Sequence, residues 1–300
     1  MIPLGDNGTV EQAVVNVNGV ISDSASAVVS VFDHGFLYGE GIYETVRTYN
    51  HRPFLLDRHL HRLRASADML GLTIPPTDEA LANAITATTD RVTFQTERYI
   101  RLLVTRGVGD LSYDPTSCAT PTIVIIVKPH RENDAAVTTD GIRIMLSSVI
   151  RNHPDAINPR IKSNNLLNSA LAMQEAMRAG ASEALMRNHR GELSECAQSN
   201  FFLVRHGIAH TPPLDAGLLE GITRNFVFEI AKVAGIPVSE TVLRAEDLHS
   251  ADEMFLTSTT REILPVTRLD DHVVGTGAAG PITRALASAF HKQARTLSGL

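Results

Sequence analysis

Residues 161–204 read IKSNNLLNSALAMQEAMRAGASEALMRNHRGELSECAQSNFFLV. Lys162 is followed by Ser, Asn and Asn at positions 163–165, residue types that commonly cap helices. A helix is predicted over residues 166–179, because apolar side chains recur there at helical spacing and Gly180 ends the run. The apolar positions of this helix are Leu167, Ala170, Leu171 and Met177.

Beyond the helix, the same segment predicts two strands and a carboxylate. Residues 184–186 and 200–204 favour strands, and turn-forming residues occupy 188–191. Glu195 would then be carried on a hairpin, where it could lie close to Lys162. A lysine at a helix start is usually a solvated surface charge. The function therefore has to follow from the residues that surround this pair.

The composition is that of an ordinary globular protein. The 300 residues are 43% hydrophobic and 20% charged, which suits one large domain or two of moderate size. The net charge of −6 and the lack of a Lys/Arg run argue against a nucleic-acid partner. The longest apolar run, residues 123–127, is too short to span a membrane. With two cysteines and no secretory signal at the N-terminus, we expect a cytoplasmic protein.

The pattern along the chain predicts an α+β protein in two unequal domains. In the first part we expect strands at 14–21 (a hairpin turning at Asn18), 28–32, 42–49, 99–105 and 122–127, and helices at 57–70, capped by Asp57, and 78–90. In the second part we expect helices at 222–234 and 281–295 and strands at 253–257 and 263–266. The polar segment 129–140 would connect a small domain, 1–128, to a larger one, 141–300.

Two patterns in the sequence suggest other kinds of site, but neither meets the requirements of that site. Gly275, Gly277 and Gly280 match GxGxxG, but none of the twenty residues after Gly280 is acidic, as the dinucleotide fingerprint requires. His59 and His61 are two apart on a predicted helix, so they point to different sides and cannot chelate one ion. We therefore predict neither a dinucleotide site nor a metal site.

Three parts of the chain suit an anion instead. Residues 221–223 (Gly-Ile-Thr) lie at a predicted helix start, where backbone N–H groups bind anions. Residues 257–260 (Thr-Ser-Thr-Thr) place hydroxyls in a turn between strands, and Arg62 offers a guanidinium fork. Together with one lysine and one glutamate, these elements indicate a phosphorylated cofactor held through an imine.

Seven segments resemble a known family and occur in its order: FDHGFLYGEGIYETVR (32–47), HLHRL (59–63), YIRLLVTRG (99–107), IKSNNLLNSALAMQEA (161–176), GELSECAQSNFF (191–202), GLLEGITRNF (217–226) and ADEMFLTSTTREILPV (251–266). They resemble the class IV aminotransferases, pyridoxal-phosphate enzymes of fold type IV. That family includes branched-chain aminotransferases, D-amino-acid aminotransferases, (R)-selective amine transaminases and aminodeoxychorismate lyases. The likeness covers nearly the whole chain.

The resemblance implies pyridoxal 5'-phosphate as the cofactor and assigns residues to it. Lys162 would form the Schiff base and move the substrate proton, and Glu195 would pair with the pyridine nitrogen. The residues implied for the phosphate are Arg62, Ile222, Thr223, Ser258 and Thr259. A homodimer with shared active sites is also implied.

Substrate residues follow from the same resemblance. Tyr99 and Arg101 match the Tyr-x-Arg of branched-chain enzymes, which contributes to binding the substrate carboxylate. The other implied substrate residues are Tyr38, Tyr43, Arg47, Leu111, Tyr113 and Thr260, with the loop of Leu111 and Tyr113 reaching over from the partner subunit. Leu166 departs from the pattern, since many branched-chain enzymes have a tyrosine there and D-amino-acid enzymes have leucine.

From the resemblance we expect a ping-pong transaminase that moves the amino group of L-leucine, L-isoleucine or L-valine to 2-oxoglutarate. The amino acids and 2-oxo acids are thus its small-molecule partners. Two alternatives on the same fold stay open. One is an aminodeoxychorismate lyase, which the stretch SECAQSN also resembles, and the other is an (R)-amine or D-amino-acid transaminase.

Overall fold

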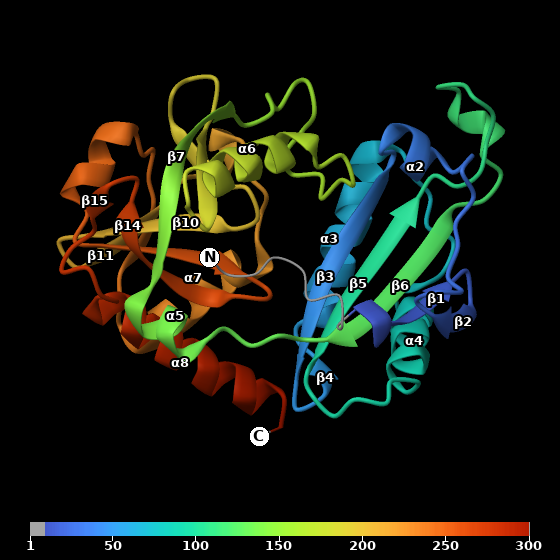
Figure 1. Ribbon diagram of the computed structural model, residues 1–300, viewed down its shortest axis with the longest axis horizontal. Helices are drawn as coiled ribbons and strands as arrows, with labels where there is room; N and C mark the ends of the chain where they lie inside the picture. Colours follow the sequence, from blue (N-terminus) through green and yellow to red (C-terminus); the bar gives the residue numbers. More distant parts are fainter. Residues whose placement is uncertain (1–9, 300) are drawn as a thin grey trace. The chain divides into compact units, whose positions relative to one another are not determined.

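The structure is a computed structural model that describes residues 10–299, shown in Figure 1. The chain forms two compact units. The small unit comprises the described residues up to Arg131 together with Ile161–Asn165, and the large unit comprises Glu132–Arg160 and the chain from Leu166 onward. Lys162 thus belongs to the small unit, although the segments on either side of it belong to the large one. The N-terminal residues considered for a secretory signal lie mostly outside the described range.

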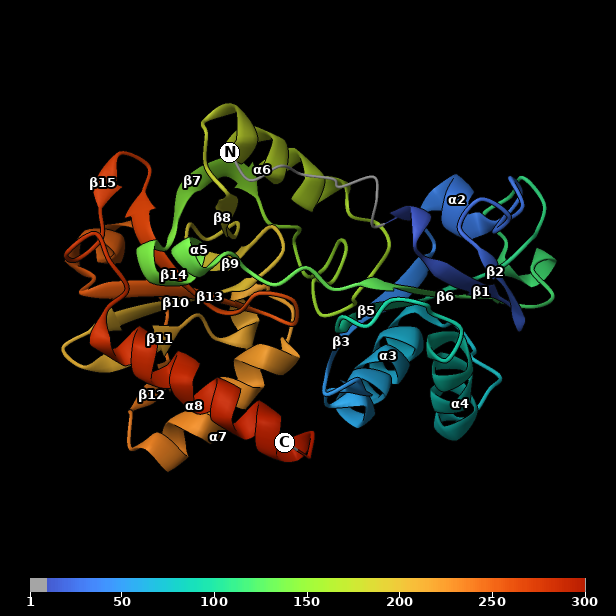
Figure 2. The same cartoon turned by 60° about the horizontal axis from the view of Figure 1, so that its bottom comes forward.

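The small unit is a six-stranded sheet with two helices on one face. Its strands follow the order β2-β1-β6-β5-β3-β4: β1 Val14–Val17, β2 Val20–Asp23, β3 Gly41–Tyr49, β4 Arg52–Pro53, β5 Arg98–Thr105 and β6 Thr122–Pro129. Helices α3 (Leu56–Leu70) and α4 (Asp78–Thr89) cover one face, as Figure 2 shows, and α2 (His34–Tyr38) precedes β3. Ile42, Val46 and Ile100 are buried beneath these helices. Because side chains alternate along a strand, Tyr43, Arg47, Tyr99 and Arg101 lie on the other face.

The large unit is built on a nine-stranded mixed sheet of order β12-β11-β10-β13-β14-β7-β8-β9, with β15 paired to β14. Its strands are β7 Ile142–Ile150, β8 Glu183–Arg187, β9 Leu193–Cys196, β10 Asn200–Arg205, β11 Ile208–Thr211, β12 Val238–Glu240, β13 Glu253–Ser258, β14 Glu262–Leu269 and β15 His272–Val273. Its helices are α5 Ala135–Asp140, α6 Leu167–Arg178, α7 Ile222–Ala234 and α8 Pro281–Leu297. Figure 2 shows α6 on one side of the sheet, with α7 and α8 on the other.

Most of the predicted helices and strands are confirmed, but the strand predicted at residues 28–32 is wrong. Residues 28–32 form no strand, and Val28 and Phe32 are 77% and 50% exposed. The β-branched run there resembles a strand, but no neighbouring strand pairs with it. The segment predicted as a connecting loop contains the short helix α5.

The caps and one helix face also differ from prediction. The N-cap of α3 is Leu55 in a left-handed conformation, and Asp57 lies in the first turn. The N-cap of α6 is Leu166, without a side-chain cap. The buried residues of α6 are Ala172 and Ala176, whereas the larger apolar side chains Leu167, Leu171 and Met177 are more than 45% exposed. Small residues face the sheet because they allow the helix to approach it closely.

Candidate active site

The backbone around Lys162 is fixed by two elements of the small unit. The Lys162 carbonyl accepts a 2.9 Å hydrogen bond from Tyr43 N–H on β3, and Lys162 N–H donates to Ser66 Oγ on α3 at 3.2 Å. Asn164 N–H donates to the Gly41 carbonyl at 2.8 Å. A Cβ on Gly41 would lie 2.7 Å from Asn164 Nδ2, so only glycine allows this approach. The backbone of Lys162 is therefore held against the sheet.

The side chain of Lys162 shares one aromatic ring with a predicted substrate residue. Lys162 Nζ lies 4.6 Å from the ring centroid of Tyr43, and the Arg101 guanidinium carbon lies 4.0 Å from it. Both are within cation–π distance. The structure thus brings together Lys162, Tyr43 and Arg101. Further cation–aromatic pairs on this face are Arg47 over Tyr49 and Lys128 over Tyr99.

Arg62 is held by a buried carboxylate on the opposite face of β3. Its Nε and Nη2 each donate to Glu44 at 2.7 Å, and His59 Nδ1 lies 2.7 Å from Glu44 Oε2. Burial by itself would raise the pKa of Glu44, but the charge and hydrogen bonds of Arg62 and His59 lower it to about 2. Burial also lowers the pKa of His59. His59 is therefore part of a structural network, and no metal-binding group of three or more side chains occurs in residues 10–299.

In the large unit, Glu195 lies on β9 itself, with donors at both carboxylate oxygens. Arg151 Nε donates to Oε1 at 2.9 Å. Asn200 Nδ2 and Leu219 N–H donate to Oε2 at 3.2 and 3.1 Å. Asn200 also donates to the Leu219 carbonyl at 2.9 Å, so it fixes the loop that precedes α7.

The predicted phosphate-binding residues of the large unit lie at a helix start and in a turn. Ile222 and Thr223 begin α7, whose N-cap Gly221 has no side chain to satisfy the first N–H groups. A Cβ on Gly221 would lie 1.9 Å from Asn200 Oδ1, so the helix start packs directly against the residue that holds Glu195. Ser258 ends β13, and Thr259 and Thr260 form the turn before β14. A helix start suited to phosphate and a buried carboxylate are two groups that pyridoxal phosphate would need.

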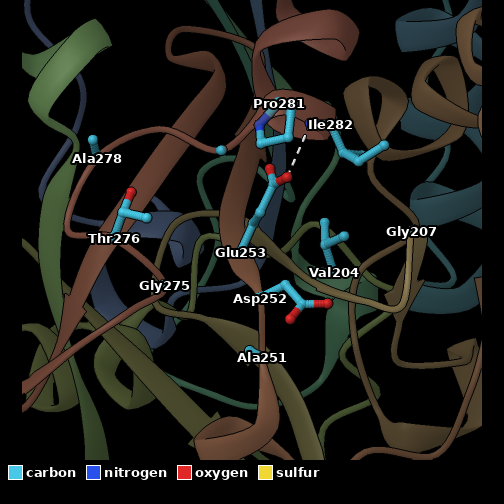
Figure 3. A pocket seen from close by; sticks show the side chains of 11 residues that line it. Val204, Gly207, Ala251, Asp252, Glu253, Gly275, Thr276, Ala278, Pro281 and Ile282 are labelled. Atoms are coloured by element: carbon cyan, nitrogen blue, oxygen red, sulfur yellow. Dashed lines mark hydrogen bonds between the residues drawn. The ribbon is translucent and has the colours of Figure 1, made fainter.

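The start of α8 differs from the start of α7, because its first backbone N–H groups are bound by a side chain of the protein. Ile282 and Thr283 N–H donate to the buried Glu253 carboxylate at 2.9 and 2.8 Å. A Cβ on Gly280 would lie 2.0 Å from Glu253 Cδ. Gly280 of the GxGxxG-like loop therefore allows the start of α8 to pack closely against the Glu253 carboxylate. The cavity beside it, about 530 Å³ and shown in Figure 3, is lined by none of the predicted site residues.

Tyr38, Leu111 and Tyr113 form a second group in the small unit. Tyr38 ends α2, and its ring centroid lies 5.0 Å from that of Tyr113. Leu111 and Tyr113 are 71% and 86% exposed. The structure therefore places these two residues on the surface of the single chain.

The fold is that of the pyridoxal-phosphate enzymes of fold type IV. Residues 41–269 match the amino-transferase class IV family, and the chain belongs to that family. It is therefore an aminotransferase, and the cofactor predicted from the sequence is confirmed for the family.

Individual relatives cover almost the full length. A putative branched-chain-amino-acid aminotransferase of Methanocaldococcus jannaschii is 42% identical, over 95% of this chain and 98% of its own. A D-alanine aminotransferase of Listeria monocytogenes is 35% identical, over 92% and 94%. The crystal structure of the branched-chain aminotransferase of Thermoproteus uzoniensis with norvaline superposes with a TM-score of 0.87 at 33% identity, covering 95% of each chain.

Four residues of the site were not singled out from the sequence. Glu44 and Asn200 lie inside the quoted motifs YETVR and QSNFF, but a motif does not reveal which side chains they contact. Ser66 and Arg151 lie outside the quoted motifs and carry no sequence signal of their own. Only tertiary packing connects them to Lys162 and Glu195.

Proposed function

We propose that the protein transfers the amino group of L-leucine, L-isoleucine or L-valine to 2-oxoglutarate. The observation that carries the proposal is the Tyr43 ring, which Lys162 and Arg101 share. An amino-acid substrate needs a cation for its carboxylate close to the amine that handles its α-proton, and this arrangement supplies both. The branched-chain aminotransferases among the similar proteins support this choice of substrate.

The cofactor supplies an electron-accepting ring when it is bound. The residues proposed to hold it are Lys162, Glu195, Arg62, Ile222, Thr223, Ser258 and Thr259. The Lys162 amine would move the proton at the substrate α-carbon, and Glu195 would pair with the pyridine nitrogen. The residues proposed to line the substrate site are Tyr38, Tyr43, Arg47, Tyr99, Arg101, Leu111, Tyr113 and Thr260.

The protein is proposed to act as a cytoplasmic homodimer whose subunits complete each other's active sites. Large apolar side chains are exposed around α2 and the loop after β5: Val28, Val31, Phe32, Phe36, Val108, Leu111 and Tyr113. Exposed apolar side chains that are concentrated in a few segments of a chain support an interface there. Sedimentation velocity is expected to give twice the mass of one chain. Within residues 10–299, no helix is long and apolar enough to cross a membrane.

Two observations support a D-amino-acid transaminase as the second candidate function. The Listeria relative is a D-alanine aminotransferase, and Leu166 stands where many branched-chain enzymes have a tyrosine. An aminodeoxychorismate lyase is the third candidate function, and its reaction class differs from that of the two transaminases.

The test is an amino-donor panel with pyridoxal phosphate. L-leucine, L-isoleucine and L-valine are each incubated with 2-oxoglutarate, and glutamate is measured. D-alanine and (R)-1-phenylethylamine are tested as donors in parallel, and aminodeoxychorismate is tested for pyruvate release. No glutamate from the branched-chain donors would refute the proposal, and turnover of another substrate would identify which alternative holds.

A further inference from the structure

Arg151 is the charged donor to Glu195. Its Nε donates to Oε1 at 2.9 Å, and only 13% of the Arg151 side chain and 8% of the Glu195 side chain are exposed. A charge-assisted hydrogen bond between largely buried groups is much stronger than one in water. It stabilises the ionised form of the carboxylate over the protonated form.

The guanidinium of Arg151 is itself fixed in direction. Arg151 N–H donates to the Arg187 carbonyl on β8 at 2.8 Å, and Nη1 donates to Asn168 Oδ1 on α6 at 3.1 Å. Asn168 Nδ2 in turn donates to the Ile150 carbonyl at 2.8 Å. Arg151 is therefore held by two elements of the large unit while it contacts Glu195.

A carboxylate that faces a pyridine nitrogen shares one proton with it. The proton on the nitrogen gives an ion pair, and the proton on the carboxylate gives a neutral pair. Burial favours the neutral pair, because separated charges lose their hydration. A ring without that proton is a weaker electron acceptor. A fixed guanidinium reverses the preference, because it disfavours protonation of the carboxylate.

We propose that Arg151 is a positioning residue that holds this proton on the ring nitrogen by keeping Glu195 ionised and correctly directed. The inference rests on the proposed function, since it requires pyridoxal phosphate to lie opposite Glu195. The competing view is that Arg151 only ties the end of β7 to β8, β9 and α6, without affecting the cofactor.

The experiment uses the holoenzyme loaded with pyridoxal phosphate labelled with ¹⁵N in the ring. The ¹⁵N chemical shift reports directly whether the ring nitrogen is protonated, independently of turnover. Wild type, Arg151→Met and Arg151→Lys are compared between pH 6 and 9. Arg205→Met serves as the matched control, because Arg205 forms a 2.9 Å pair with Asp247 elsewhere in the large unit.

Wild type and Arg205→Met are expected to give the shift of a protonated ring nitrogen throughout. Arg151→Met is expected to move to the unprotonated position, and Arg151→Lys to lie between them, because lysine keeps the charge but loses the fixed direction. A protonated shift in folded Arg151→Met overturns the inference. If Arg151→Met does not fold, Arg151→Lys decides, and a shift identical to wild type counts against the proposal. A wild-type protein without an imine absorbance band would instead refute the proposed function.

Discussion

Each unit contains a buried glutamate paired with an arginine, and the two pairs differ in how completely the carboxylate is enclosed. Glu44 is fully buried, and its oxygens receive two 2.7 Å bonds from Arg62 and one contact of 2.7 Å with His59. Glu195 receives a 2.9 Å bond from Arg151 and bonds of 3.2 and 3.1 Å from Asn200 and Leu219, and it keeps some exposure. Glu44 thus ties α3 to β3, whereas Glu195 is enclosed less completely.

The comparison predicts that substitutions near Glu44 affect stability first, whereas those at Glu195 and Lys162 affect chemistry first. Five experiments test this division.

Lys162→Ala is expected to have the largest effect. Removing the covalent attachment and the proton-transfer group should lower kcat by about 10,000-fold or more, with no imine absorbance band and little change in Tm. Spectra and initial rates check this outcome. Lys232→Ala, which alters an exposed lysine on α7, should behave like wild type. An unchanged band in Lys162→Ala would reject Lys162 as the attachment site.

Glu195→Gln is expected to lower kcat by roughly 100- to 1,000-fold, because a neutral amide no longer stabilises the protonated ring nitrogen. The Tm should fall less than in Glu44→Gln, because the bond between Glu195 and Arg151 is longer, at 2.9 Å against 2.7 Å for Glu44 and Arg62. Steady-state kinetics and thermal melts are measured together. Glu192→Gln, three residues earlier, is the matched control. A large fall in Tm with kcat retained would give Glu195 the structural role that we assign to Glu44.

Glu44→Gln should lower the free energy of unfolding by about 3–5 kcal/mol at pH 7, because it leaves Arg62 and His59 buried without their anion. Urea denaturation measures this loss. The Glu44 contribution is present above pH 4.5 and is lost as the pH falls toward 2, following its lowered pKa. Glu40→Gln, which alters a more exposed pair with Arg106, should cost about 1 kcal/mol or less. Equal losses in the two variants would contradict the comparison.

His130 should make the stability of the small unit depend on pH. Burial, followed by the charge of Arg47, lowers its pKa from 6.5 to about 4. The unfolded chain therefore binds a proton at a higher pH than the folded chain. Stability should be full above pH 6.5 and fall by up to about 3 kcal/mol as the pH drops to 4. Denaturation of His130→Gln should show a flatter profile over that range. A profile identical to wild type would exclude His130 as the source.

Gly221→Ala is expected to have the smallest effect. The new methyl group would strike Asn200 Oδ1, which lies 1.9 Å from the position that an added Cβ would occupy, while the backbone at φ −71° tolerates alanine. The resulting shift of Asn200 should weaken cofactor binding by about 10-fold, or roughly 1.4 kcal/mol. Fluorescence titration with pyridoxal phosphate measures it. Gly207→Ala tests a glycine with no neighbour within 4 Å and should leave cofactor affinity unchanged.

The regular elements were largely predictable because their signals are local. Helices α3, α4, α7 and α8 and strands β3, β5 and β13 follow from apolar periodicity and turn residues. The segment 28–32 shows the limit of such signals, because its residues favour a strand but the fold offers it no partner. Helix α6 shows a second limit. Its leucines were predicted to face the core, but the small alanine side chains pack against the sheet and the leucines are exposed.

The residue types of the site and their order could be identified from local patterns: a lysine before a helix, a glutamate 33 positions later, and the Gly-Ile-Thr and Thr-Ser-Thr-Thr segments. These indicated a phosphorylated cofactor held through an imine, and the seven quoted segments, each short and contiguous, indicated the family. The contacts themselves are visible only in the folded chain: Ser66 and Tyr43 hold the Lys162 backbone, Glu44 holds Arg62, and Arg151 binds Glu195. Arg151 and Glu195 are 44 positions apart, and Lys162 and Ser66 are 96 apart. Contacts of that range depend on how sheets and helices pack, which no local pattern encodes.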